Sequence, residues 1–249
     1  MLTLGNRVGF ITGAAQGIGY EIATVFAENG MNVVIADVNE EKSNESAEII
    51  KDKGLKAHGI FCDVTSVDSI RDSMKSAASV FGGIDVLVNS AGVLSTFCTN
   101  EMTKEEWDRV MAVNLGGTFF SAQQALPYLE KSKCARIVNI ASNAGRMGGY
   151  ESSLVYGASK GGVISLTYGL ARQLAPQKIL VNCIAPGTTK TDTAKAYSPE
   201  AIERLLAHTP LSRLGLPREI AVMACYFASE ESSFTTGAVV DVNGGMFMG

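Results

Sequence analysis

The sequence is short of positive charge. Its 21 lysines and arginines are outnumbered by 25 aspartates and glutamates, the net charge is -4 at pH 7, and no basic block or stripe occurs. A surface that binds nucleic acid or an anionic membrane carries clustered lysine and arginine. The charge pattern therefore argues against both kinds of partner.

Long apolar runs are missing as well. No stretch approaches the roughly 18 consecutive apolar residues that a membrane-spanning helix requires. The first ten residues, MLTLGNRVGF, lack the basic region, the apolar core and the small-residue cleavage site of a secretory signal peptide. We therefore expect a cytoplasmic protein without a membrane partner.

Metal-binding patterns are scarce. The five cysteines are scattered without a C-x-x-C pair, and only His58 and His208 accompany them. Because a structural zinc site needs four such ligands at close spacing, we expect no metal site. Cys62 and Cys183 lie inside apolar runs, which predicts buried, reduced thiols.

The chain has enough apolar residues to form a large hydrophobic core, because 46% of its residues are hydrophobic. Short apolar runs recur along it: VGFIT, NVVIAD, AHGIFCDV, DVLVNSAG, RIVNIAS, ILVNCIAPG and AVVDVNGG. They are rich in Val and Ile without polar alternation, which is typical of parallel strands buried on both faces. Helical patterns fill the gaps, and no linker or internal repeat divides the chain. We predict an α/β fold in a single domain, residues 1–249: a Rossmann-type doubly wound sheet of about seven parallel strands with helices on both faces.

A glycine-rich turn stands where the first apolar run gives way to an amphipathic segment. The stretch VGFITGAAQGIGYEIATVFAENG carries Gly13, Gly17 and Gly19. Glycine lets the backbone turn tightly and approach a ligand, and the helix that follows offers unpaired N–H groups to a pyrophosphate. The spacing G-x-x-x-G-x-G departs from G-x-G-x-x-G, and tight strand–helix packing is the alternative explanation.

Asp37, at the end of the second apolar run, favours dinucleotide binding. A carboxylate about twenty residues after such a turn accepts hydrogen bonds from the adenosine ribose hydroxyls, and it repels a 2′-phosphate. Neither Gln16 nor the pair Val38 and Asn39 supplies a positive charge to offset that repulsion. We therefore predict NAD rather than NADP.

The second motif is YGASK, residues 156–160, within a segment of helical spacing over about 154–174. Residues four apart share a helix face, so Tyr156 and Lys160 are expected to be neighbours. Lowering a tyrosine pKa from about 10 by three units takes roughly 4 kcal/mol of phenolate stabilisation. A lysine ammonium beside a nicotinium ring is a source of that field. A partly buried tyrosine with a surface lysine is the alternative.

Together these segments resemble the short-chain dehydrogenase/reductase family over essentially the whole chain. The matching elements are TGAAQGIG at residues 12–19, Asp63, NSAG at 89–92, Asn114, Ser142, YGASK at 156–160 and PGTTKT at 186–191. Ser90 replaces the second asparagine of the usual N-N-A-G. That change hardly touches the chemistry, because the segment mainly shapes the backbone beside the adenosine half.

The resemblance implies four catalytic residues. Tyr156 would be the general acid/base, and Lys160 would bind the nicotinamide ribose and lower the tyrosine pKa. Ser142 would hydrogen-bond the substrate oxygen. Asn114 would hold a water that links Lys160 to solvent.

The resemblance also implies a set of NAD-binding residues. They are Gly13, Gln16, Gly17, Ile18, Gly19, Asp37, Asp63, Val64, Asn89, Ala91, Gly92, Tyr156, Lys160, Pro186, Gly187, Thr189 and Thr191. The expected function is an NAD(H)-dependent oxidoreductase that interconverts a secondary alcohol and a ketone by hydride transfer. The alternatives are an NADPH-dependent 3-oxoacyl-carrier reductase, a nucleotide-sugar epimerase or dehydratase, and a non-enzymatic NAD-sensing regulator.

Assembly and substrate are the remaining questions. Two long helical segments, about 103–129 and 154–174, carry small residues, and in the resembled family the corresponding helices pair between subunits, so we expect a homotetramer. Residues 189–211 have the pattern of a short mobile helical lid suited to a medium-sized small-molecule substrate. Arg146, between Ser142 and Tyr156, either binds an anionic substrate or points to solvent or pairs with Glu151. For His208, a surface or packing role is favoured over substrate contact.

Overall fold

The computed structural model describes residues 4–150, 153–192 and 197–249. In this part of the chain, one parallel sheet has the strand order β3-β2-β1-β4-β5-β6-β7. The strands are β1 (Val8–Thr12), β2 (Asn32–Asp37), β3 (Ala57–Phe61), β4 (Val86–Asn89), β5 (Arg136–Ile140), β6 (Leu180–Pro186) and β7 (Val239–Val242). Each falls on one of the predicted apolar runs, and the predicted doubly wound fold is confirmed.

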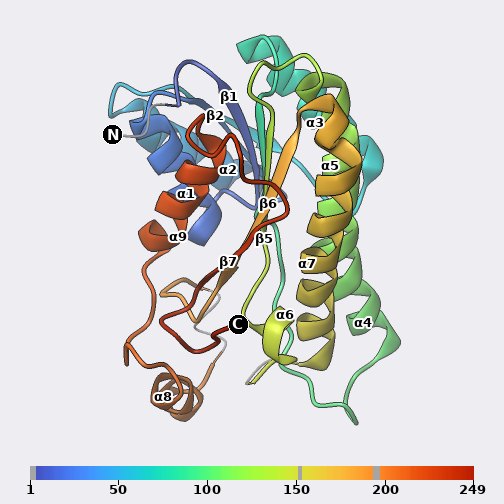
Figure 1. Cartoon of the computed structure of the whole chain (residues 1–249), viewed down its shortest axis with the longest axis vertical. Coiled ribbons are helices and arrows are strands. Elements are labelled where there is room, and N and C mark those ends of the chain that lie inside the picture. Colours follow the sequence, from blue (N-terminus) through green and yellow to red (C-terminus); the bar gives the residue numbers. More distant parts are fainter. Residues whose placement is uncertain (1–3, 151–152, 193–196) are drawn as a thin grey trace.

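Helices cover both faces of the sheet. They are α1 (Gly17–Glu28), α2 (Glu40–Lys51), α3 (Val67–Phe81), α4 (Lys104–Met111), α5 (Gly117–Leu129), α6 (Ala144–Met147), α7 (Leu154–Leu174), α8 (Pro199–Ala207) and α9 (Pro217–Ala228). Helices α1, α2 and α9 lie on one face, and α3, α5 and α7 lie on the other (Figure 1). Helix α8 lies at the bottom of the molecule as drawn, and α6 lies beside the lower end of α7 (Figure 1).

Side chains alternate along each strand and so contribute to two hydrophobic cores, one on each face of the sheet. On β1, Phe10 and its neighbour Ile11 are both fully buried but belong to different apolar clusters, one on each face of the sheet. Phe26 of α1 packs in the same cluster as Ile11, and Met74 of α3 packs in the same cluster as Phe10. Because successive residues of a strand point to opposite faces, an unbroken apolar run is what a strand covered on both sides requires.

Local capping residues set where several helices begin. The side chains of Asn39, Ser66, Thr103 and Ser198 each accept a hydrogen bond from a backbone N–H in the first turn of the helix that follows. Each thereby satisfies a donor that has no partner within the helix. Helix α3 ends at Gly82 in the left-handed conformation, with φ of 89°.

The helix predicted over about 103–129 needs a correction. It is interrupted after Met111 by a π-helical turn, Ala112–Gly116, before α5 begins. Such turns insert an extra residue into the helical ladder and are frequent at functional sites. Asn114, one of the expected catalytic residues, lies in this turn and is fully buried. The helix predicted over about 154–174 is confirmed as α7.

Three further sequence predictions can be compared with the described residues. None of their helices is long and apolar enough to cross a membrane. Cys62 and Cys183 are buried and unpaired, as predicted. The segment 189–211 contains α8, while its residues 193–196 lie outside the described part of the chain.

Candidate active site

A cavity of about 440 Å³ opens at the carboxyl ends of the central strands. It lies where β1 and β4 are neighbours and the strand order reverses direction, which is the usual ligand site of an open α/β sheet. Its volume is in the range of small-molecule sites. The predicted residues that line it are Gly13, Gln16, Gly17, Ile18, Gly19, Asp37, Asp63, Val64, Ala91, Gly92, Ser142, Tyr156, Lys160, Pro186, Gly187, Thr189 and Thr191.

The glycine turn leaves no room for side chains. Gly13 has φ of +64°, and a Cβ built on it would stand 2.6 Å from Ala91 Cα. A Cβ on Gly19 would stand 2.3 Å from the carbonyl oxygen of Gly13. Gly17, with φ of +61°, begins α1 and faces the Thr191 methyl group. The turn therefore presents bare backbone and a helix N-terminus to the cavity, a combination that suits a pyrophosphate.

Thr12 joins the glycine turn to the neighbouring strand. Its buried Oγ1 accepts hydrogen bonds from the backbone N–H groups of Ser90 and Ala91, both at 3.2 Å. The last residue of β1 thus holds the segment after β4 in place. This gives the NSAG segment a scaffolding role through its backbone, as expected from the sequence.

Asp37 stands at the carboxyl end of β2 on the cavity wall. Its Oδ2 accepts a hydrogen bond from Ala15 N–H at 3.1 Å, and its Oδ1 accepts one from Asn39 N–H at 3.0 Å. Each carboxylate oxygen keeps a lone pair for a further donor, such as a ribose hydroxyl. A cation that the sequence analysis missed lies nearby, because Lys42 of α2 donates a hydrogen bond to Gln16 Oε1.

The next strand brings a second carboxylate to the cavity. Asp63 Oδ1 accepts hydrogen bonds from the backbone N–H and the hydroxyl of Thr65. Val64 is nearly buried, and a Cβ on Gly117 would stand 2.8 Å from its Cγ2. Close packing against the start of α5 therefore fixes Val64 beside Asp63. Both belong to the residues that the resemblance implies for NAD binding, and both line the cavity.

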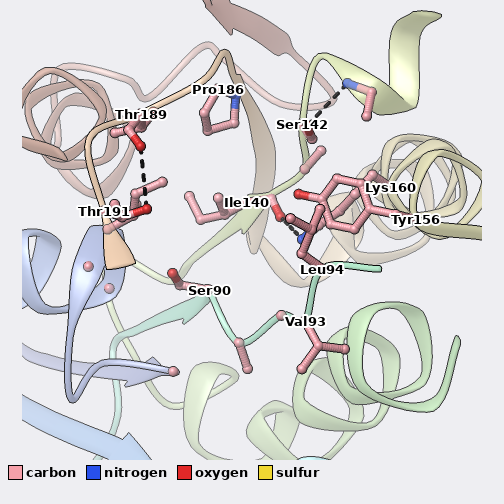
Figure 2. Close-up of a pocket in the computed structure, with 18 of the residues that line it drawn as sticks. Ser90, Val93, Leu94, Ile140, Ser142, Tyr156, Lys160, Pro186, Thr189 and Thr191 are labelled. Carbon is pink, nitrogen blue, oxygen red and sulfur yellow. Dashed lines mark hydrogen bonds between the residues drawn. The ribbon is translucent and has the colours of Figure 1, made fainter. Parts of the chain in front are cut away.

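Three expected catalytic side chains converge from the turn between β5 and α6 and from α7. Figure 2 shows Ser142, Tyr156 and Lys160 around one part of the cavity. Ser142 Oγ accepts a hydrogen bond from Ala144 N–H at 3.1 Å and donates one to Asn143 Oδ1 at 3.2 Å. The Lys160 ammonium, in a side chain that is 4% exposed, donates to the Ile140 carbonyl at 2.8 Å.

Burial sets the electrostatics of the pair in the protein alone. Burial raises the pKa of Tyr156, and only a hydrogen bond with Ser142 opposes that rise. Burial lowers the pKa of Lys160 to about 8. Lys160 Nζ lies 6.0 Å from the Tyr156 ring centroid and is engaged with a carbonyl. In this arrangement, therefore, the lysine alone does not lower the pKa of the tyrosine, and the contribution expected from a nicotinium ring stays a prediction.

Two predicted residues do not line the cavity. Asn89 is buried inside the sheet and donates to Asn139 Oδ1 at 2.9 Å, so its direct contact with a ribose is not supported by the geometry. Asn114 Oδ1 accepts from Val93 N–H, and its Nδ2 donates to Val93 O and to Ser159 Oγ.

Gly92 shows how close Asn114 nevertheless lies to the lysine. A Cβ at position 92 would stand 3.3 Å from Lys160 Nζ and 3.4 Å from Asn114 Oδ1. The two polar groups therefore flank the same glycine, although no direct hydrogen bond joins them among the contacts above. The π-helical turn is what brings Asn114 to this depth.

Sequence reasoning missed most of the other end of the cavity. Apolar and aromatic side chains line it from five segments: Val93, Leu94, Met147, Tyr150, Leu205 and Met246. The sequence offered a weak indication that Tyr150 lines the site, since it lies in the loop between Ser142 and Tyr156. Leu205 of α8 lies within the segment 189–211 that was predicted to be a lid over the substrate, whereas Met246, in the C-terminal segment, had no sequence signal.

Arg146 is engaged away from the cavity. Its Nε and Nη2 donate to the two carboxylate oxygens of Asp241 at 3.3 and 3.2 Å, and Nη2 also donates to Val239 O. Its guanidinium carbon stands 5.5 Å from the centroid of the Phe247 ring. The alternative partner Glu151 lies outside the described residues. A substrate-binding role for Arg146 is thus not supported, and it joins α6 to β7 instead.

Comparisons with known proteins agree with this geometry. A family model described as enoyl-(acyl carrier protein) reductase matches residues 13–247. The chain is 38% identical over 247 residues to a 3-oxoacyl-[acyl-carrier-protein] reductase of Aquifex aeolicus, covering 99% of both chains. It is 37% identical to the enzyme of the same name from Vibrio cholerae, covering 99% of this chain and 100% of the other.

Solved structures show the same similarity. A short-chain type dehydrogenase/reductase from Mycobacterium marinum superposes with a TM-score of 0.94 at 32% identity, covering 99% of this chain and 98% of the other. A dehydrogenase/reductase from Sinorhizobium meliloti gives a TM-score of 0.94 at 32% identity, covering 99% and 97%. With the glycine turn, the Ser142–Tyr156–Lys160 group and this full-length similarity, the chain belongs to the short-chain dehydrogenase/reductase family.

Proposed function

We propose that this oxidoreductase transfers hydride between NAD(H) and a carbonyl or carbinol carbon held beside Ser142 and Tyr156. The observation that supports this most directly is the convergence of those two hydroxyls and Lys160 on a cavity that also contains the glycine turn. The nicotinamide ring supplies or accepts the hydride.

Residues of the chain donate the proton to the substrate oxygen and stabilise the charge that develops on it. In the reducing direction the Tyr156 hydroxyl donates its proton to the substrate oxygen. Its raised pKa keeps the hydroxyl protonated, and thus ready to donate, near neutral pH. Ser142 can turn its O–H from Asn143 Oδ1 towards the same oxygen and stabilise the charge that develops there. Lys160 is placed to bind ribose hydroxyls next to Tyr156.

The substrate we propose is a 3-oxoacyl group rather than an unactivated secondary alcohol. The sequence analysis placed this alternative second, but the curated relatives described above are named as 3-oxoacyl-[acyl-carrier-protein] reductases. The apolar lining around Leu94, Met147 and Met246 accommodates an acyl chain next to the keto carbon. The reaction in that direction is reduction of the 3-keto group to a 3-hydroxyl group.

The cofactor we propose remains NAD(H), because of Asp37. Its carboxylate lies on the cavity wall, and Glu40 and Glu41 add negative charge in the first turn of α2. One observation favours NADP(H) instead: the Lys42 ammonium is drawn towards the cavity by Gln16. Because the Asp37 carboxylate lies on the cavity wall itself, the environment disfavours a 2′-phosphate.

A single assay tests both proposals. We expect consumption of NADH, followed by its absorbance, with a 3-oxoacyl thioester, and at least tenfold lower kcat/KM with a 2-alkanone of equal length. NADH should be preferred over NADPH at least tenfold, about 1.4 kcal/mol. Asp37→Ala combined with Val38→Arg should shift the preference towards NADPH. Equal use of both cofactors by the unmodified enzyme would contradict the role given to Asp37.

For assembly we propose a homotetramer. Support comes from large apolar side chains that are exposed in the single chain on the face formed by α4, α5 and α7: Trp107, Phe119, Phe120 and Tyr168. Second copies of the chain would cover them. Light scattering coupled to size-exclusion chromatography measures the mass directly, and a monomeric mass would contradict the proposal.

A further inference from the structure

The substrate end of the cavity lies between two segments that are far apart in the sequence. One is the loop between Ser142 and Tyr156, which contributes Tyr150 to the lining. The other is α8, which contributes Leu205. Helix α8 buries only one side, with Ala201 and Leu205 as its buried residues. A helix held by so few apolar contacts needs further contacts to keep a defined position.

A side-chain pair joins the two segments. The Tyr150 hydroxyl lies 2.8 Å from Nε2 of His208, the residue that caps the C-terminus of α8. The two rings also pack against each other, with centroids 4.6 Å apart and planes at 50°. The contact therefore combines a hydrogen bond with ring packing across the rim of the cavity.

The partners of the histidine assign its tautomer. His208 Nδ1 lies 2.8 Å from the carbonyl oxygen of Arg204, which can only accept, so Nδ1 carries a proton. In the neutral ring Nε2 then has a free lone pair and accepts the hydrogen bond that Tyr150 donates. His208 is in this way tied to its own helix on one side and to the catalytic loop on the other.

We propose that Tyr150 and His208 form a clasp that holds α8 across the substrate end of the cavity and improves binding of acyl chains long enough to reach it. Both are positioning residues: they act through the place of α8 and its Leu205, whereas the chemistry stays with Ser142 and Tyr156. The proposal rests on the 3-oxoacyl function proposed above for its substrate, but the clasp itself is a feature of the protein alone.

Two variants break the clasp in different ways. Tyr150→Phe keeps the ring and removes the donor, and His208→Phe keeps a ring and removes the acceptor. Each should raise KM for a long 3-oxoacyl thioester about threefold to tenfold, as loss of one hydrogen bond predicts. KM for a 3-oxobutanoyl thioester and kcat for both should be unchanged. The double variant should be no worse than His208→Phe alone, because that variant already removes the bond to Tyr150 together with the Nδ1 hydrogen bond to Arg204 O.

Amide hydrogen exchange tests the clasp without any substrate. Residues 199–207 should exchange at least threefold faster in both variants, while α7 keeps its protection. Tyr226→Phe, which removes the hydroxyl of a partly buried tyrosine on α9, is the matched control and should change neither readout.

The outcomes separate the two proposals. If no 3-oxoacyl thioester is turned over by the unmodified protein, the proposed function fails, and the exchange measurement still decides whether the clasp holds α8. Unchanged exchange in α8 overturns the clasp whatever the substrate. Faster exchange with an unchanged KM for the long substrate overturns its role in binding. A KM that rises equally for short and long substrates also overturns that role.

Discussion

The two ends of the cavity are built differently. At the cofactor end, bare backbone and residues that directly follow strands form the wall, as at Gly13, Asp37, Asp63 and Gly92. At the substrate end, side chains from a loop, from α8 and from the C-terminal segment meet, as at Tyr150, Leu205 and Met246. The first construction depends on strand order and on the absence of Cβ atoms. The second depends on tertiary contacts that can differ between chains of the same fold.

The difference explains how a common cofactor and a variable substrate share one site. The sheet holds the cofactor end at the reversal of strand order, where β1 and β4 are adjacent. The substrate end is held by contacts such as the Arg146–Asp241 ion pair and the Tyr150–His208 hydrogen bond. Changes at the two ends should therefore have separable effects on cofactor and on substrate.

The largest effect is expected where the two ends meet. Tyr156→Phe keeps the ring packing and removes the ionisable oxygen, so kcat should fall at least about a hundredfold, as loss of general acid catalysis predicts. Binding of NADH, followed by its fluorescence, should stay within about twofold, since the phenol does not carry the dinucleotide. Near-normal turnover in this variant would refute the assigned mechanism.

The second prediction concerns Lys160, whose pKa burial lowers to about 8. Below that pH the lysine is charged in both states and the burial penalty acts in full. Between about 8 and its ordinary value of 10.5 the unfolded chain binds more protons, so the free energy of unfolding rises with pH. Relative to that of Lys160→Met, the free energy of unfolding of the unmodified protein should increase by on the order of 2 to 3 kcal/mol across this pH range.

Urea unfolding at pH 7, 8, 9 and 10 measures this difference. Methionine does not titrate, so the pH dependence of the difference reports the protonation of Lys160 together with the hydrogen bond that it donates to Ile140 O. A difference between the two proteins that does not change with pH would mean that Lys160 keeps its ordinary pKa.

At the cofactor end, Gly13→Ala should weaken binding of NADH about tenfold to a hundredfold. Its φ is +64°, and its Cβ would stand 2.6 Å from Ala91 Cα, so both strain and a backbone clash displace the turn. Gly54→Ala is the control, because Gly54 also has a positive φ of +76° but has nothing within 4 Å. An equal loss of NADH affinity in both variants would show that the positive φ of the glycine, and not the close approach of a Cβ to Ala91, is responsible.

At the substrate end, Arg146→Ala should lower the free energy of unfolding by about 1 to 2 kcal/mol. The ion pair with Asp241 is largely shielded from solvent, with side chains 18% and 16% exposed, and a charged hydrogen bond there contributes more than one at the surface. NADH binding should not change. A loss of kcat/KM confined to anionic substrates would show instead that the guanidinium leaves Asp241 and binds substrate.

The sequence predicted more of the cofactor end of the cavity than of the substrate end. Glycine spacing, Asp37 and the YGASK motif are local patterns, and the residues they name line one cavity. The exceptions are Asn89, which turns into the sheet towards Asn139, and Asn114, which hydrogen-bonds Val93 and Ser159. The side to which a strand residue points depends on its register, which a motif does not contain.

The sequence by itself determined the parallel sheet, the glycine turn and the pairing of Tyr156 with Lys160, because strand burial, backbone freedom and helix periodicity are written in neighbouring residues. Only the tertiary structure decided that Arg146 meets Asp241, that His208 meets Tyr150, and that a π-helical turn lowers Asn114 towards Gly92. It also decided that Tyr156 is buried enough for its pKa to rise. These features depend on segments up to 95 residues apart along the chain, whose meeting is determined by the packing of the whole fold.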